Sequence, residues 1–529
     1  MSSSARFDIA QYGPGKQLDL KKYSPANPHG LSRYPAMPPP PLYHLRGFNP
    51  DSETQVKLEI LESLSGGIDG RAQVLLCKVI KPPPASSTVN VGEGDYEPVP
   101  GPGTRIVAKV YDSRFWPSDY GAPISNHKLA DSDLCCESYA YKYLYQKKLT
   151  GYPHLTAQYY GTWAVTLPRG KNKSMSVGLI LMEHIVGYSI DELCGRDKYE
   201  QLVPDVSAPI IFHESDQAKD GEVCLELTKE NRMEVLKQFI DGCVRHMHVG
   251  IAHNDAEPHN VFITMRNGID DLDKPRTVML DHILTEVWSM TADARKPGYE
   301  THCLEMSSKP PHPMERYSVK ALPNFAGWYP SHWVKPGNHK LFDQWLIEAF
   351  GPLEDSDESP YCTFAVVREC IKEKKAANAR MVENIKKAED DKKAEDDKKE
   401  AAEKTTQQTY NPNPDFIHFP ARFVGSSRAP HFFDDHASVF QFTTRSGHPL
   451  PPPTNWVGKW PPAYTTKVFW GAENPQAEGG EDTPEQDPRV SLPYRQASDH
   501  RPVATVKPNT DRDDPQRHEQ KDAEAKKTK

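Results

Sequence analysis

The sequence has 529 residues, a net charge of −9 and a mean hydropathy of −0.70, and its 49 prolines are concentrated towards the two ends. These values predict one large folded unit of about 300 residues, near the size at which a single hydrophobic core stops growing. The modest negative charge argues against a surface that binds nucleic acid.

The cysteines and the apolar runs indicate the compartment. Nine cysteines are scattered, odd in number and without a paired C-x-x-C framework, which favours a reducing environment. No apolar run reaches membrane-spanning length, and the first residues lack the apolar stretch of a signal peptide. We therefore expect an intracellular protein, cytoplasmic or nuclear, that does not bind membranes.

Residues 1–50 are predicted to be an arm without a core pattern. They are rich in Pro, Tyr and small polar residues, and Pro38–Pro41 are four consecutive prolines. Such composition favours extended, polyproline-like conformations. The Pro-rich arm is therefore a candidate for binding a protein partner.

Two strands and a glycine-rich turn follow. Val56, Leu58 and Ile60 alternate with polar residues, and a second apolar run covers residues 72–80. The pattern predicts a hairpin whose turn would let backbone N–H groups approach an anionic ligand. The glycines of this turn are Gly66, Gly67 and Gly70.

A loop rich in Pro and Gly, residues 81–103, is followed by a predicted strand over residues 105–112. Lys109 is a single lysine in this otherwise apolar strand, and two interpretations are open. It is either an edge-strand lysine whose side chain reaches water or a lysine that neutralises phosphate charge. A helical period over residues 131–148 carries Glu137, which is either a solvated acid or the partner of Lys109.

Two more strands, over residues 156–165 and 177–184, lead to a flexible connection that ends at Gly187. A short helix is predicted over residues 190–194. The clearest helix covers residues 230–249, because its apolar residues repeat at helical spacing. Strands first and helices afterwards predict an α+β fold in two lobes.

The long helix leads into a polar loop, residues 253–260, in which Asp255 and Asn260 stand five apart. A later apolar run, residues 278–280, ends at Asp281. A tight loop and a strand that delivers a second carboxylate would gather oxygen-bearing side chains around one phosphate and its metal ion.

Beyond residue 281 the second lobe is expected to continue to residue 380, with a helix over residues 363–371. Residues 381–404 repeat a short charged unit and predict a solvated helix without the stripe of a coiled coil. Residues 405–529 are predicted to be a largely disordered Pro-rich and charged tail, another candidate for binding protein partners.

Taken together, residues 55–290 resemble the protein kinase superfamily. The match includes Val107-Ala108-Lys109 and the pattern H-x-D-x-x-P-x-N from His253 to Asn260. The resemblance implies a protein-kinase-like fold of a divergent, atypical member. Its N-lobe would be rich in β-strands, over residues 51–187, and its C-lobe mainly helical, over residues 188–380.

The resemblance also implies site residues. Lys109 would hold the α- and β-phosphates of ATP and be oriented by Glu137, while Asp255 would orient the substrate hydroxyl. Asn260 and Asp281 would hold Mg²⁺. Backbone groups would bind the rest of the nucleotide, those of Gly66, Gly67 and Gly70 at the phosphates and those of Met182, Glu183 and Ile185 at adenine.

The implied function is an ATP- and Mg²⁺-dependent phosphotransferase that acts on a hydroxyl group, with a protein Ser or Thr expected. Glu257 stands where most Ser/Thr kinases have a lysine, Asn254 replaces an arginine, and Asp281-His282-Ile283 replaces Asp-Phe-Gly. Small-molecule kinases of the aminoglycoside and choline kinase type relax the same positions. A pseudokinase scaffold that binds nucleotide or partners without turnover is the alternative from another class.

A zinc site in the same region is a weaker interpretation, because the spacing matches no familiar ligand pattern. Its ligands would come from Cys243, His246, His248, His253 and His259. A hydrolase with a Ser or Cys nucleophile is disfavoured because no nucleophile-elbow motif is present.

Overall fold

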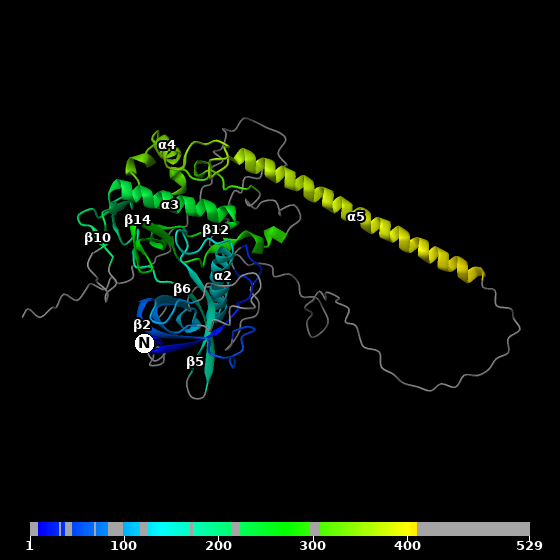
Figure 1. The fold of residues 1–529 in the computed structure, drawn as a ribbon, viewed down its shortest axis with the longest axis horizontal. Helices are drawn as coiled ribbons and strands as arrows, with labels where there is room; N and C mark the ends of the chain where they lie inside the picture. Colours follow the sequence, from blue (N-terminus) through cyan, green and yellow to red (C-terminus); the bar gives the residue numbers. More distant parts are fainter. Residues whose placement is uncertain are drawn as a thin grey trace, which may run out of the picture. The chain divides into compact units, whose positions relative to one another are not determined.

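The computed structural model describes residues 9–30, 33–36, 45–67, 70–82, 99–116, 125–169, 173–212, 223–295 and 307–409. In these ranges the chain is a mixed α+β fold that contains a closed, six-stranded antiparallel barrel and four α-helices (Figure 1). Predictions for residues 83–98 and 410–529 lie outside the described residues.

The barrel is formed by strands from the first part of the chain. In order around it the strands are β1 (Gln17–Lys22), β2 (Val56–Ser65), β3 (Gln73–Lys81), β4 (Arg105–Val110), β6 (Ser174–Glu183) and β5 (Tyr159–Pro168). Pairing of β1 with both β2 and β5 closes the barrel. Alternate side chains of all six strands fill its interior, as the period of two requires.

Strand β1 corrects the prediction of an N-terminal arm without core residues. Leu18 and Leu20 are at most 1% exposed and belong to the barrel core, whereas Asp19 between them is exposed. The prediction is wrong here because an alternation of only two apolar residues is too short to stand out among prolines and polar residues.

The four helices are α2 (Asn126–Gln146), α3 (Lys229–His248), α4 (His339–Phe350) and α5 (Phe364–Thr409). Helix α2 packs against β5, β6 and β15. It begins five residues before the predicted start at residue 131, because the Ser125 side chain caps it by accepting from the Lys128 backbone N–H. The prediction of α3 is confirmed, and its apolar stripe is buried.

Short strands and 3-10 turns make up most of the remainder. The strands are β7 (Tyr188–Ser189), β8 (Cys194–Arg196), β9 (Leu202–Pro204), β10 (Ile210–Ile211), β11 (Cys224–Leu225), β12 (Ile251–His253), β13 (Val261–Asn267), β14 (Asp270–Met279) and β15 (Thr285–Val287). The 3-10 turns are η1 (Ala10–Tyr12), η3 (Ser113–Phe115), η4 (Pro258–Asn260), η5 (Trp288–Met290), η6 (Asp293–Arg295), η8 (Pro313–Glu315), η9 (Val319–Ala321), η10 (Pro323–Phe325) and η11 (Ser331–Val334).

The predicted helix over residues 190–194 is wrong, because this segment is a turn that leads into β8. The Glu192 carboxylate accepts hydrogen bonds from the backbone N–H of Ser189 at 2.7 Å and from its hydroxyl at 3.0 Å. Such local bonds between side chain and backbone compete with helix formation.

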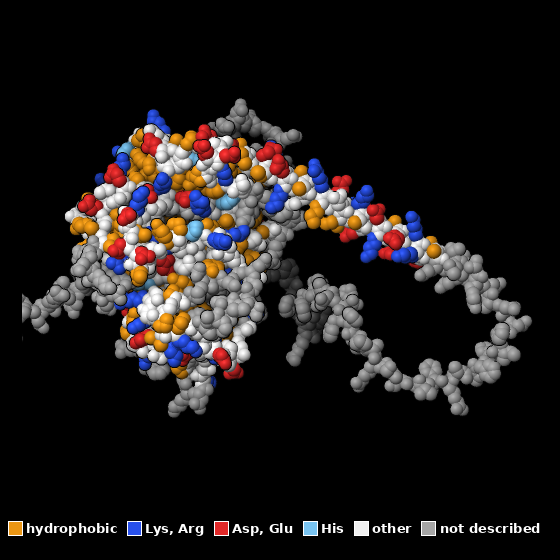
Figure 2. Space-filling view, in the orientation of Figure 1, with side chains coloured by type: hydrophobic (Ala, Val, Ile, Leu, Met, Phe, Trp, Pro, Cys, Tyr) orange, Lys and Arg blue, Asp and Glu red, His pale blue; other side chains and the backbone are white. Residues whose placement is uncertain are grey.

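Helix α5 covers both the predicted helix over residues 363–371 and the charged segment that follows it. Val367 near its start is buried, whereas residues 381–402 are exposed. Figure 2 shows Lys and Arg side chains interspersed with Asp and Glu along this helix. No helix in the described ranges has the length and apolar character needed to cross a membrane.

Candidate functional site

Lys109, Glu137 and Asp281 come from three distant parts of the chain and meet at one point. The Lys109 Nζ lies 2.9 and 2.8 Å from the two Glu137 carboxylate oxygens and 2.9 Å from Asp281 Oδ1. Strand β4 is paired on both sides, so the alternative of Lys109 as an edge-strand lysine is wrong. Helix α2, which carries Glu137, is held against the barrel and supplies the fixed carboxylate.

The two carboxylates differ in exposure. The Glu137 side chain is fully buried, whereas 43% of the Asp281 side chain is exposed. Burial alone would lower the pKa of Lys109, but the charges of Asp281 and Glu137 raise it overall, so the lysine stays protonated. The site therefore combines a protonated lysine with a carboxylate that is open to a cation.

Glu137 is held by more than the lysine. The Tyr111 hydroxyl donates to one of its carboxylate oxygens, and the His282 backbone N–H donates to the other at 3.2 Å. Burial raises the pKa of Glu137, and the Lys109 charge counters this effect. Sequence reasoning missed Tyr111, although it lies on the predicted strand two residues after the lysine.

The loop that contains Asp255 and Asn260 is closed by a side chain. The Asn260 Nδ2 donates to the Asp255 backbone oxygen at 2.9 Å and to Asp255 Oδ2 at 3.1 Å. The His253 Nδ1 accepts from the Asp255 backbone N–H at 3.3 Å. Asp255 is thus fixed in orientation while 30% of its side chain stays exposed.

The antiparallel β13–β14 hairpin joins this loop to Asp281. Val261 pairs with Met279, and the Leu280 backbone N–H donates to the Asn260 oxygen at 2.9 Å. Burial lowers the pKa of His253, while the carboxylates of both Asp255 and Asp281 raise it, so both lie near the same ring. Asn260 therefore bonds Asp255 through its side chain and Leu280, the residue before Asp281, through its backbone oxygen.

The backbone at Asp281 has an uncommon conformation. Its φ of 59° lies in the left-handed region, which costs a residue other than glycine about 1–2 kcal/mol. The next side chain, His282, turns inward and is fully buried, with its ring 4.7 Å from that of Tyr141 and 4.9 Å from that of His253. Tyr141 in turn stacks on Tyr159 of β5, with their ring centroids 5.7 Å apart. A series of packed aromatic and histidine rings therefore connects the barrel to the loop that contains Asp255.

The glycine-rich turn lies beside Lys109 but is closed by a side chain. Val74 on β3 pairs directly with Lys109. The Gly67 N–H donates to Gln73 Oε1 at 2.8 Å, and the Gln73 Nε2 donates back to the Gly67 oxygen at 3.1 Å. The Gly70 N–H is also used within the turn, at 3.3 Å from the Gly67 oxygen.

A Cβ atom at Gly66, whose φ is 127°, would lie 2.6 Å from the Gln73 side chain. The glycine is therefore required for this closed turn. Gln73 is 1% exposed and was not singled out in the sequence. Phosphate binding by the Gly67 amide would require Gln73 to release it.

The segment expected to bind adenine is partly occupied. The Glu183 N–H donates to the Gln158 oxygen at 2.9 Å, and the Glu183 carboxylate binds Arg276 through two bonds of 2.6 and 2.9 Å. Met182 lies in the ladder opposite Val107. Among the described residues, the backbone groups of Ile185 have no hydrogen-bond partner, so Ile185 alone of the three residues keeps both groups for a ligand.

Glu257, the acid in place of a lysine, points to a neighbouring turn. Its carboxylate accepts from Asn324 Nδ2 at 2.6 Å, and burial raises its pKa. The alternative zinc site is not assembled, because its Cys and His ligands do not form a metal-sized group in the described ranges.

Comparison with protein-family models and with curated proteins finds no match to this chain. The functional assignment consequently depends on the site itself, in which Lys109 binds Glu137 and Asp281, and Asn260 binds Asp255.

Proposed function

We propose that this chain is an ATP- and Mg²⁺-dependent phosphotransferase of protein-kinase-like fold that transfers the γ-phosphate to a hydroxyl group. The observation that carries the proposal is the Lys109 ammonium group between Glu137 and Asp281, which lie 28 and 172 positions away in the sequence. Phosphoryl transfer depends mainly on charge neutralisation and alignment. A lysine fixed by one buried carboxylate and shared with an exposed one meets the first requirement.

The oxygen atoms near Asp281 fit a magnesium ion. Mg²⁺ prefers oxygen ligands, and Lys109 occupies only Oδ1 of the half-exposed Asp281 carboxylate. Because the Asn260 Nδ2 donates to Asp255, the Oδ1 of Asn260 is the side-chain atom that remains for a cation. Bound there, Mg²⁺ would neutralise charge on the phosphates.

Asp255 is suited to orient the attacking hydroxyl group. One of its carboxylate oxygens is held by Asn260, which leaves the other to accept a hydrogen bond from a substrate. The proposed acceptor is a Ser or Thr of a protein, and a small-molecule alcohol is the alternative. Residues 296–306, which follow the Asp281 segment, lie outside the described residues.

A nucleotide-binding scaffold without turnover is a second candidate. It is favoured by the closed glycine turn, in which Gln73 occupies the Gly67 amide, and by the Glu257 carboxylate two residues after Asp255. Both features oppose phosphate binding, the first by competition and the second by charge repulsion.

Two measurements on the full chain test the proposal. Mg-ATP in excess over its Kd should raise the Tm of the wild-type protein, because a ligand that binds only the folded state stabilises it. Lys109→Met should abolish most of this shift, whereas Lys78→Met, at an exposed position on β3, should keep it. No shift for the wild-type protein would overturn nucleotide binding.

Turnover separates the two candidates. Asp255→Asn should keep the Mg-ATP shift and lower ATP turnover about 100-fold or more, since a positioned acid or base typically contributes 10²–10⁴-fold. Asp270→Asn, on the exposed β13–β14 turn, is the matched control. A Tm shift without turnover in the wild-type protein would establish the scaffold, and turnover unchanged by Asp255→Asn would refute the assigned chemistry.

A further inference from the structure

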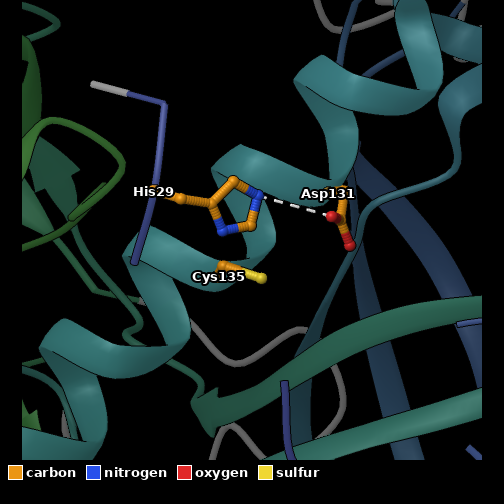
Figure 3. Close-up of side chains that lie close together, drawn as sticks. All are labelled: His29, Asp131 and Cys135. Carbon is orange, nitrogen blue, oxygen red and sulfur yellow. Dashed lines mark ion pairs between the residues drawn. The ribbon is translucent and has the colours of Figure 1, made fainter. Parts of the chain in front are cut away.

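A second group of polar side chains lies beside helix α2 and consists of His29, Asp131 and Cys135 (Figure 3). All three are buried, and one potential ligand atom from each lies within 4.8 Å of the others. Asp131 and Cys135 are one helical turn apart, so they share a face of α2. His29 comes from the segment after β1, and Figure 3 shows its ring directed at this face.

The segment that carries His29 is anchored so that its ring has a fixed orientation. The His29 backbone oxygen accepts from the Ser132 hydroxyl at 2.7 Å and from the Cys136 thiol at 3.5 Å. The His29 Nδ1 lies 3.0 Å from the Asn27 oxygen. A ring nitrogen beside a carbonyl carries the proton, so in the neutral ring the lone pair is on Nε2.

The distance between His29 and Asp131 suggests what lies between them. The His29 Nε2 is 3.4 Å from Asp131 Oδ2, beyond the roughly 2.7–3.2 Å of ordinary N–H···O bonds. Two ligands about 2.0–2.1 Å from a tetrahedral zinc ion are about 3.4 Å apart. Because the Nε2 of a neutral ring and the carboxylate are both acceptors, a cation is needed between them, either a proton or a metal ion.

We propose that His29 Nε2, the Asp131 carboxylate and Cys135 Sγ bind Zn²⁺. Nitrogen, oxygen and sulfur ligands together suit this borderline-soft ion, and three protein ligands leave its fourth position to a water molecule. Binding would form a bond between zinc and the Cys135 sulfur and release the thiol proton to solvent. The carboxylate and the thiolate would then balance the two charges of the ion.

The surroundings are compatible with this exchange of a proton for a metal ion. Burial and the Asp131 charge raise the pKa of the Cys135 thiol, so without a metal ion the thiol stays protonated. Arg46 is near enough to lower the pKa values of both His29 and Cys135, and Tyr23 also faces the group. The proposed ion would attach the N-terminal segment to α2, and this inference does not depend on the phosphotransferase proposal.

The experiment uses the full chain, stripped with a chelator and then given one equivalent of Zn²⁺ or Co²⁺. The wild-type protein should bind one ion, gain Tm on zinc addition, and with Co²⁺ show a thiolate-to-metal charge-transfer band. Cys135→Ser should lose the band, and His29→Gln should weaken zinc binding at least tenfold. Cys136→Ser alters an adjacent buried thiol that bonds the His29 oxygen, and it should keep the band.

Two results would overturn the metal site. One is a wild-type Tm that neither chelator nor zinc changes, together with no charge-transfer band; this result assigns the group to a proton-mediated ion pair. The other is a band of equal strength in Cys135→Ser, which places the ion at another cysteine. The first of these results comes from the wild-type protein, so it can overturn the site even if a variant fails to fold.

Discussion

Helix α2 carries two buried polar groups that are built in opposite ways. Near its middle, Glu137 faces a lysine, a tyrosine hydroxyl and a backbone N–H, so a negative charge meets donors only. Two and six residues earlier, Cys135 and Asp131 face His29, and here the Nε2 of a neutral ring meets a carboxylate, both of which are acceptors. The first group is complete with protein atoms alone, whereas the second is complete only with an added cation.

The histidines that touch the two groups show the same contrast. His282, next to the first group, has its pKa lowered well below the usual value by burial and by the charges of His253, His246 and Lys109. His29, in the second group, has its pKa raised because the Asp131 carboxylate lies beside its ring. Burial lowers the pKa of both rings, and at His29 alone of the two the Asp131 carboxylate outweighs this effect.

The largest expected effect comes from removing the acid of each group in turn. In the presence of a chelator, Glu137→Ala should lower the free energy of unfolding by about 3–5 kcal/mol, because it removes the fully buried partner of Lys109 and leaves the lysine paired only with the half-exposed Asp281. Asp131→Ala should lower it by about 1–3 kcal/mol, since the His29 ring can lose its proton. Urea denaturation measures both losses. If Asp131→Ala lost as much stability as Glu137→Ala, or more, the contrast between the two groups would be refuted.

A smaller effect is expected from Tyr111→Phe, which removes one of the donors to Glu137 and leaves the Lys109 pair intact. The loss should be about 1.5–3 kcal/mol, the usual contribution of a hydrogen bond to a charged group. Tyr188→Phe, whose hydroxyl makes a 3.4 Å bond at an exposed position, is the control and should change the stability little. Urea denaturation measures the free energy of unfolding of both variants. Equal values for Tyr111→Phe and Tyr188→Phe would show that the Tyr111 hydroxyl does not stabilise Glu137.

The smallest effect is a difference in pH dependence. Because the folded-state pKa of His282 is below the unfolded value, its contribution is present above about pH 6.5 and is lost as the pH falls. His282→Phe should therefore remove about 1 kcal/mol of the stability lost between pH 6.5 and 5.5. The folded-state pKa of His29 is raised, so without metal its contribution is present below about pH 6.5 and is lost as the pH rises.

Urea denaturation from pH 5 to 8 with a chelator present measures these slopes. His29→Gln should change the slope in the direction opposite to His282→Phe. Slopes of the same sign for the two buried histidines would contradict their opposite environments.

The sequence allowed the long elements and the pairing of Lys109 with Glu137 to be predicted, but not the other contacts that hold these side chains. The lysine on β4, the acid on α2 and the loop before β13 stand on strongly periodic segments, so their order was enough to suggest a common site. Three residues that hold the predicted site residues were missed, namely Gln73, Tyr111 and Arg276. Each makes its contact through one side chain, and a single side chain produces no periodic pattern in the sequence. The 2.8 and 3.1 Å bonds by which the Gln73 side chain closes the glycine turn are of this kind.

The group around His29 was invisible for a different reason. Asp131 and Cys135 have the spacing of one helical turn, but the third member lies 102 positions before Asp131 in a segment that was predicted to lack core residues. The pairing of β1 with β2 and β5 fixes where the chain leaves the barrel, and the segment that follows β1 then places His29 against α2. The proline-rich composition of residues 1–50 concealed strand β1, and therefore also the contact of His29 with helix α2.

The closure of the barrel by β1 has a practical consequence for any shortened form of the protein. Removal of the first fifty residues would leave β2 and β5 as two unpaired edges, and such edges pair readily with other chains. It would also uncover the core side of the barrel where Leu18 and Leu20 pack. A truncated protein that begins at β2 should therefore self-associate through these edges.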